Sequence, residues 1–115
     1  GNAAFRLICT NAPRRALGLG LVASAPDVAG TNFLALGMTL HVDPFASAVF
    51  LGLDFFSDPV GVGAAALPIP NLPSLAGATL YGQSIWIEDA PNGQLTSGAF
   101  VGLVSSVGLS FTIQP

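Results

Sequence analysis

Lysine is absent from this sequence, and its basic residues are limited to Arg6, Arg14 and Arg15. Charged residues make up 8% of the 115 positions, against about a quarter in average globular proteins. With a net charge of −3, the chain lacks the basic patches that attract nucleic acid or anionic lipid. We therefore expect no nucleic-acid partner.

Cysteine and histidine are almost absent as well. One cysteine, Cys9, cannot form an internal disulfide, and with one histidine, His41, it cannot supply a zinc site. No run of about 18 apolar residues is free of Gly, Pro, Asp and Asn, so we expect no membrane-spanning helix. Residues 1–5 have neither the basic start nor the apolar core of a signal peptide. If the protein is secreted, we expect this sequence to be its mature form or a fragment.

Hydrophobic residues, by contrast, make up 51% of the chain. A small monomer stays soluble through scattered surface charge, which this chain lacks. Either much of the surface consists of uncharged polar groups and glycine, or partners cover part of it, and we favour the second alternative. The composition therefore predicts a homo-oligomer or polymer. The shortage of Lys and Arg leaves few sites for trypsin-like proteases, which suits a durable extracellular protein.

Apolar residues alternate with period 2, which is typical of β-strands that are buried on one face. Residues 107–113 show the pattern most clearly, and residues 5–10, 17–21 and 38–43 repeat it. Turn formers, among them Ala25-Pro26-Asp27, separate about eight short strands. One helical turn is expected at residues 72–77. We predict a single domain over residues 1–115, all-β, with an antiparallel β-sandwich or jelly-roll-like fold.

Two segments, residues 49–56 and 79–87, are apolar on both faces. No segment can serve as a crossover helix, so we expect an antiparallel sheet whose extra apolar face meets a loop, a neighbouring subunit or a ligand. One region contributes more aromatic residues than a single hairpin can bury, and we expect about half of them in the core and half at an interface. The interface candidates are Phe45, Phe50, Phe55 and Phe56, together with Phe5 and Leu7 of the first strand.

Residues 2–10 are also a candidate for donation to the sheet of a neighbouring subunit. They alternate cleanly, and residues 11–15 give them a polar hinge. Pairing of Phe5, Leu7 and Cys9 within their own domain is the other alternative, and the sequence leaves both open.

Residues 66–83 carry a recognisable pattern. An Ala-Leu-Pro-Ile-Pro-Asn strand end precedes the expected helical turn, and a Leu-Tyr-Gly-Gln strand follows it. This pattern resembles a β-sandwich module found at the C-termini of large secreted proteins of planctomycetes and myxobacteria. Further matches are Thr39, Leu40, Val42, Asp43 and Pro44 upstream, and Asp89 and residues 109–113 downstream. The resemblance implies an extracellular, non-catalytic module, and a free-standing copy is expected to be a subunit that assembles.

Residues with catalytic or metal-binding potential are sparse, and we expect neither an enzyme nor a cofactor. His41 and Asp43 lack a serine on a Gly-x-Ser-x-Gly turn, and the adjacent Glu88 and Asp89 point to opposite faces of a strand. Asp54 and Asp58 flank a turn without the acidic run of a calcium loop.

Carbohydrate binding would use exposed aromatic residues, for which Tyr81 and Trp86 are candidates beside Gln83. Trp86 lies on the opposite face of its strand from the other two, and we expect Trp86 or Tyr81 to pack in the core, with its N–H or O–H bonded locally.

Taken together, these patterns predict a structural subunit of an extracellular or cell-surface filament or layer, which assembles through apolar β-surfaces. The alternative is a monomeric extracellular module that binds carbohydrate or a cell-surface partner.

Overall fold

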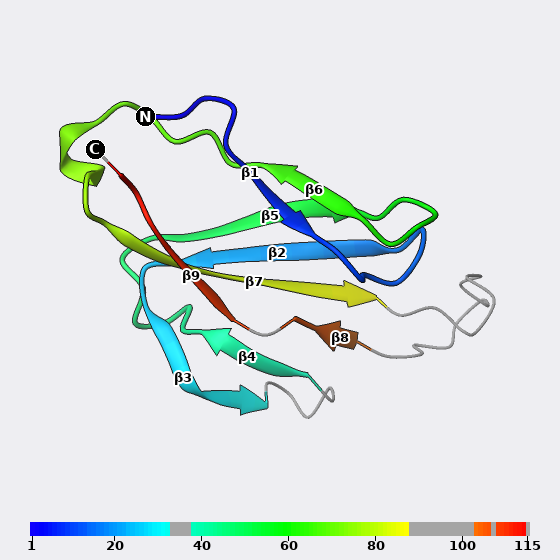
Figure 1. The fold of residues 1–115 in the computed structure, drawn as a ribbon. Coiled ribbons are helices and arrows are strands. Elements are labelled where there is room, and N and C mark those ends of the chain that lie inside the picture. Colours follow the sequence, from blue (N-terminus) through cyan, green and yellow to red (C-terminus); the bar gives the residue numbers. More distant parts are fainter. Residues whose placement is uncertain (33–37, 88–102, 107, 115) are drawn as a thin grey trace.

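The computed structural model of the chain describes residues 1–32, 38–87, 103–106 and 108–114. These residues form nine strands and one short 3-10 turn, and every paired strand runs antiparallel to its neighbour. A central sheet packs against one two-stranded sheet on each of its faces (Figure 1). The predicted all-β antiparallel sandwich is confirmed.

The central sheet has the order β5, β2, β7, and its far edge is shared by two strands that both pair with β7. β8 pairs with the second half of β7 and β9 with the first half, and the register shifts by one residue between them. The bounds are β2 Leu17–Ala23, β5 Phe50–Phe56, β7 Thr79–Ile87, β8 Leu103–Ser105 and β9 Leu109–Thr112.

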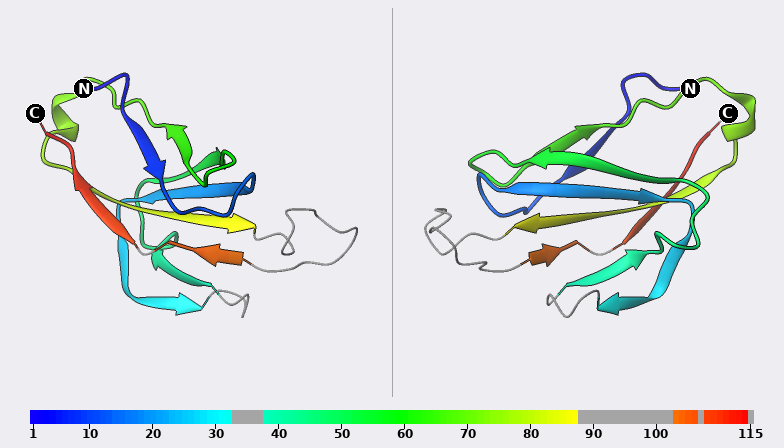
Figure 2. Two further views of the ribbon diagram at one scale, coloured as in Figure 1. Left: turned by 45° about the vertical axis from the view of Figure 1, so that its right-hand side comes forward. Right: turned by 180° about the vertical axis from the view of Figure 1, so that it is seen from behind.

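The two outer layers are the pairs β1–β6 and β3–β4. β1 (Arg6–Cys9) pairs with β6 (Gly63–Ala66), and β3 (Pro26–Asn32) pairs with β4 (Thr39–Val42). The 3-10 turn η2 (Pro73–Leu75) lies at the end of the molecule where both termini meet (Figure 2). β1 therefore pairs within its own chain here, as one of the two alternatives expected.

The core beneath β1–β6 is built around two aromatic rings, those of Phe55 and Trp86, which are 3% exposed each and meet edge-on at 5.7 Å between centroids. Glycines clear the space for both rings. A Cβ at Gly18 would lie 2.6 Å from the Trp86 ring, and one at Gly20 would lie 2.3 Å from the Phe55 ring. Side chains at these positions of β2 would displace the rings. The indole N–H of Trp86 donates to Ser84 at 3.1 Å, so its expected core packing and local bond are confirmed.

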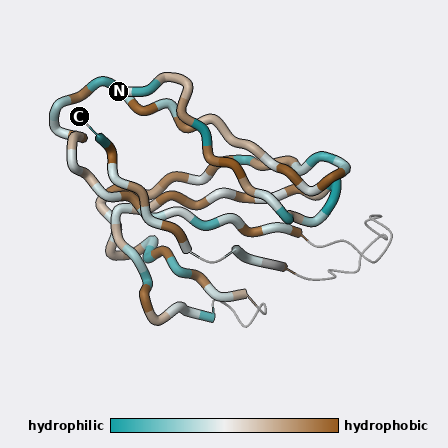
Figure 3. Tube along the Cα trace, in the orientation of Figure 1, coloured by the Kyte–Doolittle hydropathy of each residue, from teal (hydrophilic) through white to brown (hydrophobic). Residues whose placement is uncertain are grey.

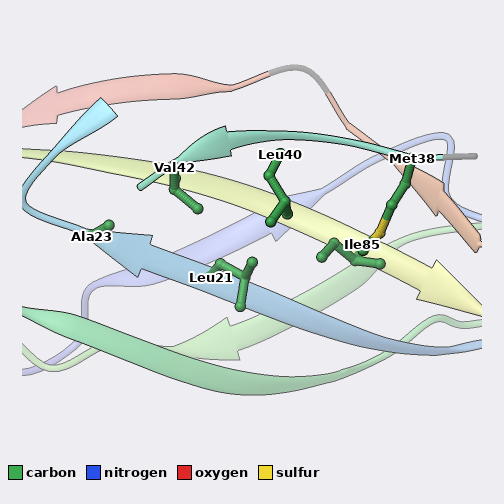
Figure 4. Packing of buried hydrophobic residues seen from close by; sticks show 6 residues of the cluster. All are labelled: Leu21, Ala23, Met38, Leu40, Val42 and Ile85. Carbon is green, nitrogen blue, oxygen red and sulfur yellow. The ribbon is translucent and has the colours of Figure 1, made fainter. Parts of the chain in front are cut away.

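The core on the other face joins the central sheet to β4. Figure 4 shows its buried apolar side chains, which come from β2, β7, β4 and the residue before β4: Leu21, Ala23, Met38, Leu40, Val42 and Ile85. Met38, Leu40 and Val42 point inward, as their spacing predicted.

A buried glutamine holds β4 against the central sheet. Gln83 is 3% exposed, its Oε1 accepts the backbone N–H of His41 at 2.8 Å, and its Nε2 donates to the backbone oxygens of Thr39 and Ser106 at 2.6 and 3.0 Å. The side-chain amide takes the place of a peptide group of a neighbouring strand. Polar backbone atoms of β4 are thereby satisfied where no strand pairs with them.

Most predicted strands are present, but β3, β6 and β8 were not predicted. The turn predicted at Ala25-Pro26-Asp27 is wrong except at Ala25, because β3 begins at Pro26. Proline is tolerated as the first residue of an edge strand. β6 consists of glycine and alanine, whose small side chains give no alternation to read. The expected helical turn is confirmed as η2.

We expect Gly20→Ala to lower the free energy of unfolding by about 1–3 kcal/mol, because the added methyl group would overpack against Phe55. Gly52→Ala is the control, since a Cβ there would meet its nearest atom, in Leu19, at an ordinary 3.5 Å. Urea unfolding of both variants measures the difference. Equal stabilities would contradict this packing.

Gln83→Leu should destabilise the protein by about 2 kcal/mol or more, because it leaves buried backbone groups of β4 without partners. Gln114→Leu, at an exposed position, is the control and should change stability little. Thermal unfolding followed by circular dichroism makes the comparison. An unchanged midpoint for Gln83→Leu would show that Gln83 does not hold β4 in place.

Candidate interaction surface

One face of the central sheet is only partly covered. β4 packs over Leu21, Ala23 and Ile85, but it leaves the start of β2 and all of β5 open on the same side. Strand pairing places Leu17 beside Phe56 and Leu19 beside Asp54 on this side of the sheet. We call this surface the β2–β5 face, and its residues are Leu17, Leu19, Phe50, Asp54 and Phe56.

The exposed side chains of the β2–β5 face are large and apolar. Leu17 is 55% exposed, Leu19 41%, Phe50 43% and Phe56 66%. Their exposed surface totals on the order of 400 Å², if a fully exposed side chain of this size contributes about 200 Å². An exposed apolar surface of this size is often functional in a small protein. Figure 3 shows that apolar segments extend along the outer layers as well as the central sheet.

A hollow of about 360 Å³ continues the β2–β5 face toward β4. Leu17, Leu19 and Asp54 line one side of it, while Met38, Ile85 and Ile87 line the other. The surface therefore combines protruding aromatic rings with an apolar depression, which is the anatomy of a protein interface centre.

Asp54 is the one charged group on this face. The other described aspartates serve turns: Asp27 accepts the backbone N–H of Gly30, Asp43 that of Phe45, and Asp58 that of Val60. Among the described residues, no hydrogen bond or ion pair engages the carboxylate of Asp54. Asp54 is exposed, so water solvates its carboxylate in a single chain.

The predicted interface residues do not form one cluster. Phe50 and Phe56 both lie on the β2–β5 face, at opposite ends of β5, whereas Phe55, on the other side of the same strand, is buried. Phe45 is 88% exposed and lies beside β3–β4. The structure buries one of these four rings, fewer than the expected half.

Phe5 and Leu7 lie on the opposite side of the central sheet. Both are half-buried, Leu7 against the Phe55 and Trp86 core and Phe5 with its ring 5.6 Å from that of Phe111. They belong to the packing of β1 on its own domain rather than to the β2–β5 face.

Leu17 and Leu19 were missed as surface residues. Alternation with glycine suggested that the leucines of β2 face the core, but Leu21 alone among them is buried, and the glycine side of β2 meets Phe55 and Trp86. No signal in the local sequence reveals this inversion, because it depends on aromatic residues in β5 and β7.

A second, more polar hollow of about 360 Å³ lies beside β3, where Asp27, His41 and Tyr81 share its lining. The hydroxyl of Thr31, which donates to Asp27 at 2.5 Å, holds the pKa of this carboxyl below its ordinary value, against the opposing effect of desolvation. Gln83 and Trp86, the other carbohydrate-binding candidates, are buried.

The candidate catalytic and metal-binding residues are used locally or lie apart. Asp43 accepts backbone N–H groups in the turn after β4, and Asp58 does so in the turn after β5. No group of three or more His, Cys, Asp or Glu side chains suited to a metal ion occurs in the described part of the chain. Glu88 and Asp89 lie outside the described residues.

Comparison with known proteins gives no relative: no family model, no curated protein and no solved structure matches the chain. Within the described ranges, none of the helical structure is long and apolar enough to cross a membrane.

Adjacent phenylalanines of β5 should differ sharply in their effect on stability. Phe55→Ala should lower the free energy of unfolding by about 3–5 kcal/mol, because it empties a buried site. Phe56→Ala should change it by less than about 1 kcal/mol, because the ring is largely solvated. Urea unfolding measures both. A large loss for Phe56→Ala would place this ring in the core and remove it from the interaction surface.

Proposed function

We propose that this protein is a structural subunit of an extracellular filament or surface layer, which assembles through its apolar β-surfaces. The observation that carries the proposal is the β2–β5 face, on which large apolar side chains surround a single charge. Burial of such a surface against a partner releases its hydration water and drives association.

The scarcity of charged residues supports an assembled protein rather than a monomeric one. The chain has six acidic and three basic residues, so few charges remain to keep exposed apolar groups of separate molecules apart. The β2–β5 face includes the edge strand β5, whose sequence Phe-Leu-Gly-Leu-Asp-Phe-Phe has no lysine or proline. Charged side chains, lysine above all, and proline protect a sheet edge against pairing with another chain, and Asp54 is the one such residue in β5.

Location outside the cell rests on the resemblance of residues 66–83 to the secreted modules and on the scarcity of protease sites. Fractionation of the native cells, followed by detection of the protein with an antibody, addresses location independently of assembly.

The alternative function, a monomeric module that binds carbohydrate, is favoured by the hollow beside β3. Tyr81 offers a ring for stacking, and Asp27 and His41 offer polar groups for sugar hydroxyls. The two functions differ in oligomeric state: assembly predicts large species at high protein concentration, whereas the module predicts a monomer that binds a glycan.

Phe56→Asp should leave the fold intact and raise the concentration required for assembly by at least about tenfold, because the new carboxylate would be buried without a partner. Sedimentation velocity and negative-stain microscopy measure assembly, and circular dichroism checks the fold. Phe45→Asp is the matched control, since Phe45 is 88% exposed and lies away from the β2–β5 face. If wild-type protein is monomeric up to millimolar concentration, the proposed function is wrong.

A further inference from the structure

The β2–β5 face requires a partner surface, and the same chain carries a complementary one. Building on the proposed function, we infer that the β2–β5 face of one subunit packs against the outer face of β1–β6 on the next subunit. This outer face consists of the outward side chains of the pair, and its residues are Arg6, Ile8, Ala64 and Ala66.

The two faces differ in surface shape. On β1–β6, strand pairing places Arg6 beside Ala66 and Ile8 beside Ala64, and all of these side chains are exposed. The alanines form a low surface, whereas the rings of Phe50 and Phe56 and the leucines of β2 protrude from the β2–β5 face. Large side chains opposite small ones interdigitate when two sheets pack about 10 Å apart. Ile8, which is 66% exposed, would fit toward the hollow beside Leu17 and Leu19.

The two faces also carry one charge each, of opposite sign. Asp54 is the charged member of the β2–β5 face, and Arg6 is the charged member of the β1–β6 outer face. Among the described residues, neither side chain has a hydrogen-bonding or ion-pair partner within its own chain. An arginine brought to Asp54 gives the carboxylate a charge-assisted partner as the surface around it is desolvated. Contact between two copies of the β2–β5 face would instead bring two Asp54 carboxylates together, which costs several kcal/mol.

The position of the two faces determines the kind of assembly. β1–β6 covers one side of the central sheet, and the β2–β5 face lies on the other side. A contact between different surfaces on opposite sides of a subunit repeats head to tail from copy to copy, which produces a filament unless the rotation between copies closes a ring.

Charge reversal tests this pairing. Asp54→Arg and Arg6→Asp should each raise the concentration required for assembly by at least about tenfold, because each variant opposes like charges across the contact. The double variant, Asp54→Arg with Arg6→Asp, should assemble as the wild type does. An equimolar mixture of the two single variants should also assemble, because each supplies the charge that the other requires. Arg14→Asp is the control for a change of net charge away from both faces.

The results of these experiments distinguish a failure of the pairing between Asp54 and Arg6 from a failure of the proposed function. Assembly that is blocked by Phe56→Asp but unchanged by either reversal would retain the proposed function and overturn the pairing of Asp54 with Arg6. Stronger assembly of Asp54→Asn than of the wild type would show that Asp54 opposes association, which contradicts the inference. Failure of the double variant to assemble while it remains folded by circular dichroism would also overturn it. A wild-type protein that never assembles would refute both the inference and the proposed function.

Discussion

Close approach of Phe55 and Trp86 to the glycines of β2 is the constraint on which the rest of the structure depends. Gly18 and Gly20 let the two rings, which meet edge-on, pack closely against β2 beneath β1–β6. Because side chains alternate along a strand, the same arrangement turns Leu17 and Leu19 to the opposite side. This packing therefore fixes the side that the leucines face, and the reach of β4 determines which of them are covered, because Leu21 is buried whereas Leu17 and Leu19 are exposed.

Unequal covering of the central sheet follows from this packing. β1–β6 covers the Phe55 and Trp86 side but leaves Leu51 and Leu109 exposed, whereas β3–β4 reaches only part of the other side, where Gln83 holds it through three hydrogen bonds. The uncovered strip joins large apolar side chains to a single unpartnered carboxylate. In a chain with 8% charged residues, such a surface supports assembly as its function, and we propose the β1–β6 outer face of a second copy as its partner.

Sequence patterns predicted the strand class and most strand positions, because alternation in 5–10 and 38–43 reflects packing that each strand undergoes locally. They did not predict β3, whose Pro-Asp start is typical of a turn, β6, whose alanines carry no pattern, or β8. The surface was predicted in part: Phe50 and Phe56 were candidates, but Leu17 and Leu19 were not. The glycine side of β2 is buried because aromatic rings from other strands lie against it. That information belongs to the tertiary structure.

Electron cryomicroscopy of the wild-type protein, at a concentration where it assembles, tests most directly whether a neighbouring subunit covers the β2–β5 face. We expect every β2–β5 face to lie against the β1–β6 pair of the next subunit, with Asp54 beside Arg6 at the contact. A structure in which the β2–β5 face is open to solvent, or packs on its own copy about a two-fold axis, would contradict this assembly.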